Sequence, residues 1–129
     1  MTHVIGTALN VQDLARAIDF YTNVLGMKES ARYELESFNE VVMSSGEGSG
    51  AATIMLVERP DHSGPYTLGD GLYKVMIDVD DVRLTCERVT KWGGTIEVQP
   101  AELPAHGVTM AMVLDVDGYR LELLQVSRP

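Results

Sequence analysis

The sequence predicts an α+β protein built from two copies of one βαβββ unit. Two stretches show the same order: an alternating apolar pattern typical of a strand, an aspartate, and then apolar residues at helical spacing. They match with an offset of 68 residues, which places Val11 on Val79 and Asp13 on Asp81. Three segments with strand periodicity follow each helix. One helix covers only one face of a sheet, so we expect the two repeats to form a curved mixed sheet around a cavity, with the helices on the outer face.

The first repeat spans about residues 2–58. A strand is predicted at 2–11, where alternate residues are apolar. Asp13 is expected to cap a helix that ends at Gly26, and the apolar positions between them follow helical spacing. Further strands are predicted at 27–34, 38–44 and 51–58. The glycine- and serine-rich run at 45–50 is expected to be a hairpin loop.

The second repeat spans about residues 71–125 and follows a linker at 59–70 that contains two prolines and two glycines. A strand is predicted at 72–79, and Asp81 is expected to cap a helix that stops at Gly93 and Gly94, with Gly94 matching Gly26. Strands follow at 95–99 and 108–114, joined by a loop through Pro100 and Pro104. A turn at 115–118 leads into the last strand. We expect a single domain over residues 1–129.

Composition limits the partners of this protein. Ten basic and 19 acidic side chains give a formal charge of -9, which argues against nucleic acid and anionic membranes as partners and suits a cationic ligand. A single cysteine, Cys86, excludes an internal disulfide and fits a reducing compartment. The start does not look like a leader segment, and no apolar run reaches membrane length, so a cytoplasmic location is expected.

Three motifs resemble the vicinal oxygen chelate superfamily, which includes glyoxalase I, bleomycin-resistance proteins, methylmalonyl-CoA epimerase and extradiol dioxygenases. They are LNVQDL at 9–14, FYTNVLGM at 20–27 and DVDGYRLE at 115–122. The resemblance covers essentially the whole chain and implies the glyoxalase-like fold. It also implies a homodimer, because one short chain of this kind rarely covers both faces of its sheets. It does not identify the reaction, since this fold hosts many chemistries.

The resemblance implies four inward positions, where small glyoxalases place His, Glu, His and Glu around a metal. In this sequence those positions hold Gly6, Met55, Lys74 and Glu122. Only Glu122 is a suitable ligand, because glycine has no donor, a thioether binds such metals poorly and an ammonium repels a cation. We therefore expect no metal and no other cofactor.

Lys74 and Glu122 are the candidate catalytic residues. Both have the inward parity of their strands, and a buried ionisable group needs a partner, so we expect them to lie within reach of each other. Two interpretations remain open: a static salt bridge that replaces a lost metal, or a functional pair in which Lys74 polarises a carbonyl or carboxylate while Glu122 accepts a proton. The candidate ligand-binding residues share the inward parity or lie in a loop near the expected cavity mouth: Asn10, Met55, Met76, Asp78, His106 and Arg120.

Two functions fit this set of residues. The first is a metal-independent small-molecule binder of the bleomycin-resistance kind, for which an acidic protein suits a cationic aromatic ligand. The second is a glyoxalase-like or epimerase-like lyase or isomerase that uses Glu122 as base next to a carbonyl. An extradiol dioxygenase is disfavoured, because its two histidine ligands have no counterpart here. Whether the protein is an enzyme stays open at this point.

Overall fold

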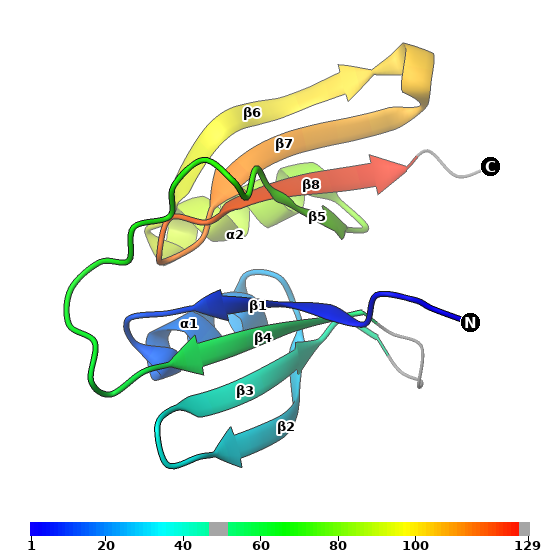
Figure 1. The fold of residues 1–129 in the computed structure, drawn as a ribbon. Coiled ribbons are helices and arrows are strands. Elements are labelled where there is room, and N and C mark those ends of the chain that lie inside the picture. The colour runs from blue at the N-terminus through cyan, green and yellow to red at the C-terminus, as the bar shows by residue number, and fades with distance from the viewer. Residues whose placement is uncertain (47–51, 127–129) are drawn as a thin grey trace. The chain divides into compact units, whose positions relative to one another are not determined.

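A computed structural model describes residues 1–46 and 52–126 of the chain. It divides into two compact units, Met1–Tyr66 and Thr67–Pro129. Each unit is one βαβββ repeat with its own four-stranded mixed sheet and one helix (Figure 1), so the predicted α+β class and the two repeats are confirmed. Within the described residues, neither helix is long and apolar enough to cross a membrane.

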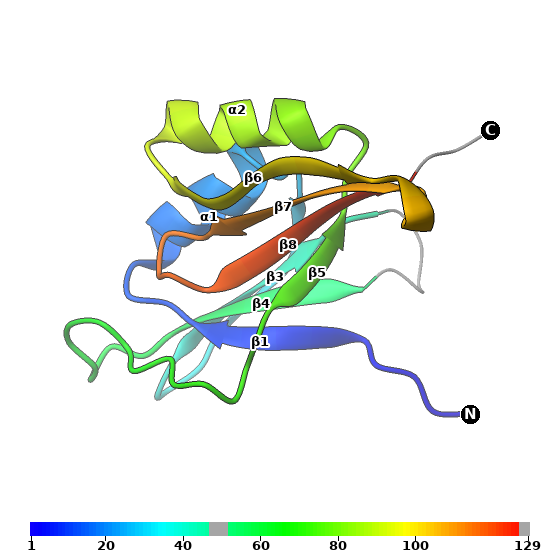
Figure 2. The same ribbon diagram turned by 90° about the horizontal axis from the view of Figure 1, so that it is seen from above.

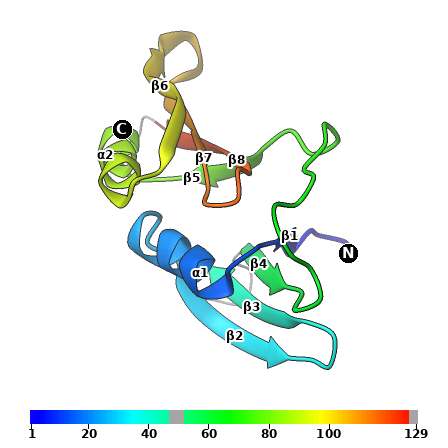
Figure 3. The ribbon, with the colours of Figure 1, turned by 90° about the vertical axis from the view of Figure 1, so that its left-hand side faces the viewer.

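The first unit contains β1 (Gly6–Asn10), α1 (Leu14–Asn23), β2 (Lys28–Glu34), β3 (Asn39–Ser44) and β4 (Thr53–Glu58). Its sheet has the order β1-β4-β3-β2, with β1 parallel to β4 and the other neighbours antiparallel. Helix α1 lies against one face of this sheet (Figure 3). The apolar side of the helix supplies buried side chains, among them Phe20 and Tyr21, whose rings meet edge to face at 5.4 Å.

The second unit contains β5 (Val75–Asp78), α2 (Val82–Trp92), β6 (Thr95–Leu103), the short 3-10 helix η1 (Pro104–His106), β7 (Val108–Leu114) and β8 (Arg120–Val126). Its sheet repeats the same plan in the order β5-β8-β7-β6, with β5 parallel to β8. Helix α2 packs along β6 and β7 (Figure 2). Val82, Val89, Leu121 and Leu123 are fully buried in this unit.

Both helices are capped in the same two ways. The aspartates expected as caps accept hydrogen bonds from the backbone: Asp13 from Arg16 N at 3.1 Å and Asp81 from Leu84 N at 3.0 Å. A side chain from the last strand of each unit also reaches the first turn. Glu58 accepts a hydrogen bond from Leu14 N at 2.8 Å, and Gln125 accepts one from Val82 N at 2.9 Å. The start of each helix is therefore held by its own unit's final strand.

Strand register confirms the internal repeat and corrects one detail of it. Ala8 pairs with Met55 in the first unit, and Met76 pairs with Glu122 in the second. The offset changes from 68 to 67 residues between these partners, and the helix ends locate the change. Gly26 and Gly93 both take the left-handed conformation, with φ of 73° and 92°. The predicted match of Gly26 with Gly94 is therefore wrong by one residue.

Several predicted boundaries are also wrong. Unit 1 begins its ladder at Gly6, and β5 is limited to Val75–Asp78, so Lys74 precedes the strand. The strand predicted at 95–99 continues to Leu103 through Pro100. Proline is tolerated there because β6 is an edge strand whose register shifts between Val98 and Ala101. Most of the loop predicted at 45–50 lies outside the described residues.

Candidate functional site

An ion pair joins the two residues expected to be catalytic. Lys74 Nζ lies 2.9 Å from Glu122 Oε2, and the exposed fractions of the two side chains are 23% and 11%. Parallel pairing sets Met76 opposite Glu122, and Lys74 lies two residues before Met76, just ahead of the strand, where its side chain reaches the carboxylate. Glu122 is thus a buried carboxylate, and its cationic partner offsets the free-energy cost of burying the charge. The roles of the two residues remain a prediction.

Tyr73 and Arg120 lie beside this pair. The Tyr73 ring centroid is 5.0 Å from Lys74 Nζ and 5.6 Å from Arg120 Cζ, so the ring contacts two cations. Arg120 Nη1 also donates to the Tyr73 carbonyl at 3.3 Å. A regular strand from residue 72, as the sequence predicts, would put Tyr73 on the opposite face from Lys74. Since β5 starts at Val75, strand parity does not fix the direction of Tyr73.

A second ion pair holds Arg120 in place. Its Nε lies 2.5 Å from Oε1 of Glu97, and its Nη2 donates to the other carboxylate oxygen at 3.1 Å. This two-point contact lowers the pKa of the Glu97 carboxyl and raises the pKa of the Arg120 guanidinium, mainly through the hydrogen bonds. Sequence reasoning did not find Glu97. The sequence shows Glu97 only as an acidic residue in the strand predicted at 95–99. The sheet order, which places that strand two positions from β8, comes from the structure.

The structure brings only part of the predicted ligand-binding set near Glu122. Met76 is its strand partner, with 64% of the residue exposed, and Arg120 lies on the same strand. Asp78 is exposed at the far end of β5. His106 is in η1, beyond the Leu103–Val108 pair that ends the β6–β7 ladder, and is not brought to this cluster.

The remaining two predicted residues belong to the first unit. Met55 lies in β4 opposite Ala8, at the position that matches Glu122 in the repeat. Asn10 ends β1, and its side-chain oxygen accepts a hydrogen bond from Arg59 Nε at 3.3 Å. Arg59 in turn stacks over the Phe38 ring at 5.5 Å. The Asn10 amide is therefore already engaged within its own unit.

The four inward positions do not fit a metal. A side chain at Gly6 would collide with Thr53, whose carbonyl oxygen lies 2.7 Å from an ideal Cβ and whose hydroxyl oxygen is closer still. That hydroxyl is fixed by a 3.0 Å hydrogen bond to the Ile5 carbonyl. Met55 offers a thioether, and Lys74 offers an ammonium already bound to Glu122. Among residues 1–46 and 52–126, no group of three or more His, Cys, Asp or Glu side chains is arranged to hold a metal ion.

Comparison with known proteins gives a consistent family assignment. Residues 2–123 match the model of the Glyoxalase/Bleomycin resistance protein/Dioxygenase superfamily. A lactoylglutathione lyase from Neisseria meningitidis is 36% identical over 122 residues, covering 92% of this chain and 87% of that protein. A probable lactoylglutathione lyase from Synechocystis is 32% identical over 124 residues, covering 94% of this chain and 93% of that protein.

Solved structures give the same result for the fold. Glyoxalase I from Zea mays superposes with a TM-score of 0.87 and 26% identity; the match covers 97% of this chain and 45% of the maize chain, so this protein spans less than half its length. The trypanothione-dependent glyoxalase I of Leishmania major superposes with a TM-score of 0.82 and 26% identity, covering 97% of this chain and 87% of that one.

Proposed function

The chain belongs to the glyoxalase, bleomycin-resistance and dioxygenase superfamily, and from this premise we propose that it binds a small molecule without using a metal. The observation that carries the proposal is the Lys74–Glu122 ion pair. Lys74 Nζ lies 2.9 Å from Oε2 of Glu122, which is the one carboxylate that a metal would need. A cation on this carboxylate would have to displace Lys74, and in residues 1–46 and 52–126 Glu122 is not part of any group of three or more His, Cys, Asp or Glu side chains that could hold it.

The ligand chemistry follows from the side chains around the pair. Lys74 is a hydrogen-bond donor for a carbonyl or carboxylate, and 23% of its side chain is exposed, so a ligand can reach it. Met76 and Tyr73 are 64% and 62% exposed and offer apolar contact beside it. A charge of -9 favours a ligand that is cationic elsewhere. We therefore propose a ligand with a flat apolar body, a carbonyl group and a cationic group.

The proposal also covers the oligomeric state of the protein and its location in the cell. We expect residues 1–129 to act as one domain and two copies to form a homodimer in the cytoplasm. Exposed apolar side chains on the second sheet support an assembly that covers them, among them Met76, Val98 and Val126. Sedimentation at micromolar concentration tests this point, and a monomer would contradict it.

Elemental analysis and ligand binding test the metal-free function together. Protein purified without added metal is expected to carry far less than one zinc, nickel, iron or manganese per chain. Binding of a cationic aromatic probe such as ethidium is then measured with and without a chelator. Equal affinity in both samples supports the proposal. About one bound metal per chain that is lost in Glu122→Ala would overturn it.

A lyase or isomerase is the second candidate function. The relatives named lactoylglutathione lyase, which are 36% and 32% identical over nearly the whole chain, favour it. In that case Glu122 would accept a proton next to a carbonyl that Lys74 polarises. The test is formation of lactoylglutathione by the purified protein, with Glu122→Gln as the matched control. Turnover that Glu122→Gln abolishes and that a chelator leaves unchanged would establish a metal-free enzyme.

A further inference from the structure

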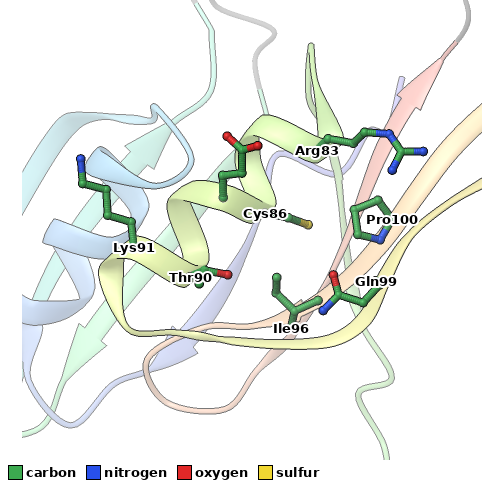
Figure 4. Close-up of a pocket in the computed structure, with 8 residues that line it drawn as sticks. Arg83, Cys86, Thr90, Lys91, Ile96, Gln99 and Pro100 are labelled. Carbon is green, nitrogen blue, oxygen red and sulfur yellow. The ribbon is translucent and has the colours of Figure 1, made fainter.

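An open groove of about 510 Å³ lies in the second unit between α2 and β6, and neither Lys74 nor Glu122 lines it. Figure 4 shows the Cys86 sulfur pointing from the helix toward Pro100, with Ile96 and Gln99 on β6 and Thr90 on the helix. The volume is within the range of pockets that hold small molecules, about 300–1,000 Å³.

The floor of this cavity is apolar. Cys86 is 4% exposed, and burial raises the pKa of its thiol, so the sulfur is uncharged at neutral pH. Ile96 and Pro100 complete the floor from β6, while Thr90 and Gln99 supply a hydroxyl and an amide at its edge. A flat hydrocarbon body fits such a floor, and a polar group on it finds hydrogen-bond partners at the rim.

The rim carries two cations, Arg83 and Lys91, and one carboxylate, Glu87, in a protein that is strongly acidic overall. Arg83 lies at the Pro100 end of the cavity and Lys91 lies beyond Thr90 at the other end (Figure 4). Helix α2 has three basic side chains and one acidic one, whereas the whole chain has a charge of -9. Arg83 is 3.9 Å from Glu102, and both side chains are more than half exposed, so this ion pair is weak and easily given up.

The first unit provides an internal comparison, because α1 and β2 form the equivalent groove there. Aligning the two capping aspartates places Ala15 on Arg83, Ile18 on Cys86 and Asn23 on Lys91. The groove there lies toward the start of α1 and has about 300 Å³, and its lining has three carboxylates, from Asp13, Glu34 and Glu58, against one cation, Arg32. The wide floor and the cationic rim are therefore features of the second unit and not requirements of the fold.

We propose that the groove between α2 and β6 is a second binding site, which takes a small molecule with a flat apolar body and one anionic group. The apolar body lies over Cys86, Ile96 and Pro100, and the anion contacts Arg83 or Lys91. This site is distinct from the Lys74–Glu122 pair and does not depend on the function proposed for it.

The probe for this proposal is anilinonaphthalene sulfonate, with the uncharged phenylnaphthylamine as its matched ligand control. The unit-1 residues supply matched variants: Arg83→Ala with Lys91→Asn removes the charge, and Cys86→Ile fills the floor. We expect saturable sulfonate binding that weakens by about tenfold or more in either variant, equivalent to about 1.4 kcal/mol. The neutral probe is expected to lose affinity only in Cys86→Ile.

Two-dimensional amide NMR locates the bound probe independently. Shifts are expected in residues 83–91 and 96–100, and Lys74→Met is expected to leave the sulfonate affinity unchanged. Urea midpoints confirm that each variant is folded. If Cys86→Ile does not fold, Arg83→Ala with Lys91→Asn still tests the proposal. The proposal is overturned if there is no saturable binding, if the shifts gather on β5 and β8, or if the charge variant binds as tightly as the original protein.

Discussion

Lys74→Met and Glu122→Gln provide the sharpest test of the ion pair in the second unit. At 2.9 Å the gross attraction between two unit charges is about 6 kcal/mol for an effective dielectric of about 20. Much of this is offset by the desolvation of both groups, so the net worth of the pair is small. The cost appears when one partner is removed and the other remains buried with its charge.

The two single changes are expected to differ. Lys74→Met leaves a carboxylate that is only 11% exposed, so we expect a loss of about 2–3 kcal/mol, somewhat below the 3–5 kcal/mol typical of fully buried pairs. Glu122→Gln leaves a lysine that is 23% exposed and can turn toward water, so about 1–2 kcal/mol is expected. The double variant is expected within about 1 kcal/mol of the original protein, which gives a coupling of about 3–4 kcal/mol.

Urea unfolding of the four proteins, with midpoints and slopes compared, is the assay. The Arg83–Glu102 pair is the matched control from the same unit, because it is 3.9 Å long with side chains 60% and 70% exposed. A parallel cycle there is expected to give a coupling below about 0.5 kcal/mol. Near-zero, additive effects at Lys74 and Glu122 would refute the buried pair. Intact stability with lost ligand binding would instead mark the pair as functional.

Three further predictions concern other features of the molecule. Gly6→Ala is expected to lower the urea midpoint by an amount equivalent to about 1–3 kcal/mol, because the added Cβ would meet the Thr53 carbonyl oxygen at 2.7 Å; Gly71→Ala, whose Cβ meets nothing within 4 Å, is the matched control, and equal midpoints for the two variants would contradict the close approach at Gly6. At neutral pH the original protein is expected to have a higher urea midpoint than Glu97→Gln, and this difference is expected to vanish as the pH falls. The folded pKa of Glu97 lies below its ordinary value of 4.5, so the stabilisation is present above 4.5 and is lost as the pH drops through the lower folded pKa, while Arg120 stays charged throughout. Asp81→Ala removes the hydrogen bond to Leu84 N and is expected to cost about 1 kcal/mol, whereas Asp80→Ala next to it is expected to have little effect; equal urea midpoints for the two variants would show that the cap is unimportant.

The sequence was sufficient for the repeat because strand and helix periodicities are local signals that recur at a fixed offset. Asp13 and Asp81 were correctly identified as caps, since an aspartate just before a helical apolar pattern is a strong start signal. Strand ends were predicted less well. Pro100 reads as a loop residue, yet it lies within β6, because only the sheet order reveals that β6 is an edge strand.

Part of the candidate site also depended on information that alternation does not contain. Lys74 and Glu122 were predicted as a pair from parity and the repeat, and their contact at 2.9 Å is present. Tyr73 and Glu97 were missed, because each reaches its partner from a place where the backbone departs from regular strand geometry: Tyr73 precedes β5, and Glu97 lies where the β6 register shifts between Ile96 and Val98.

The hydrogen bonds from the last strand of each unit to the first turn of its helix have a consequence for how each half of the chain acquires its structure. Glu58 lies 44 residues after Leu14, and Gln125 lies 43 residues after Val82. Neither helix can therefore saturate its first backbone amide until the end of its own repeat has been synthesised and has docked. A nascent chain that stops short of Gln125 keeps the Asp81 cap, but its Val82 amide still lacks this side-chain partner, so the first turn of α2 is completed only when β8 docks beside it.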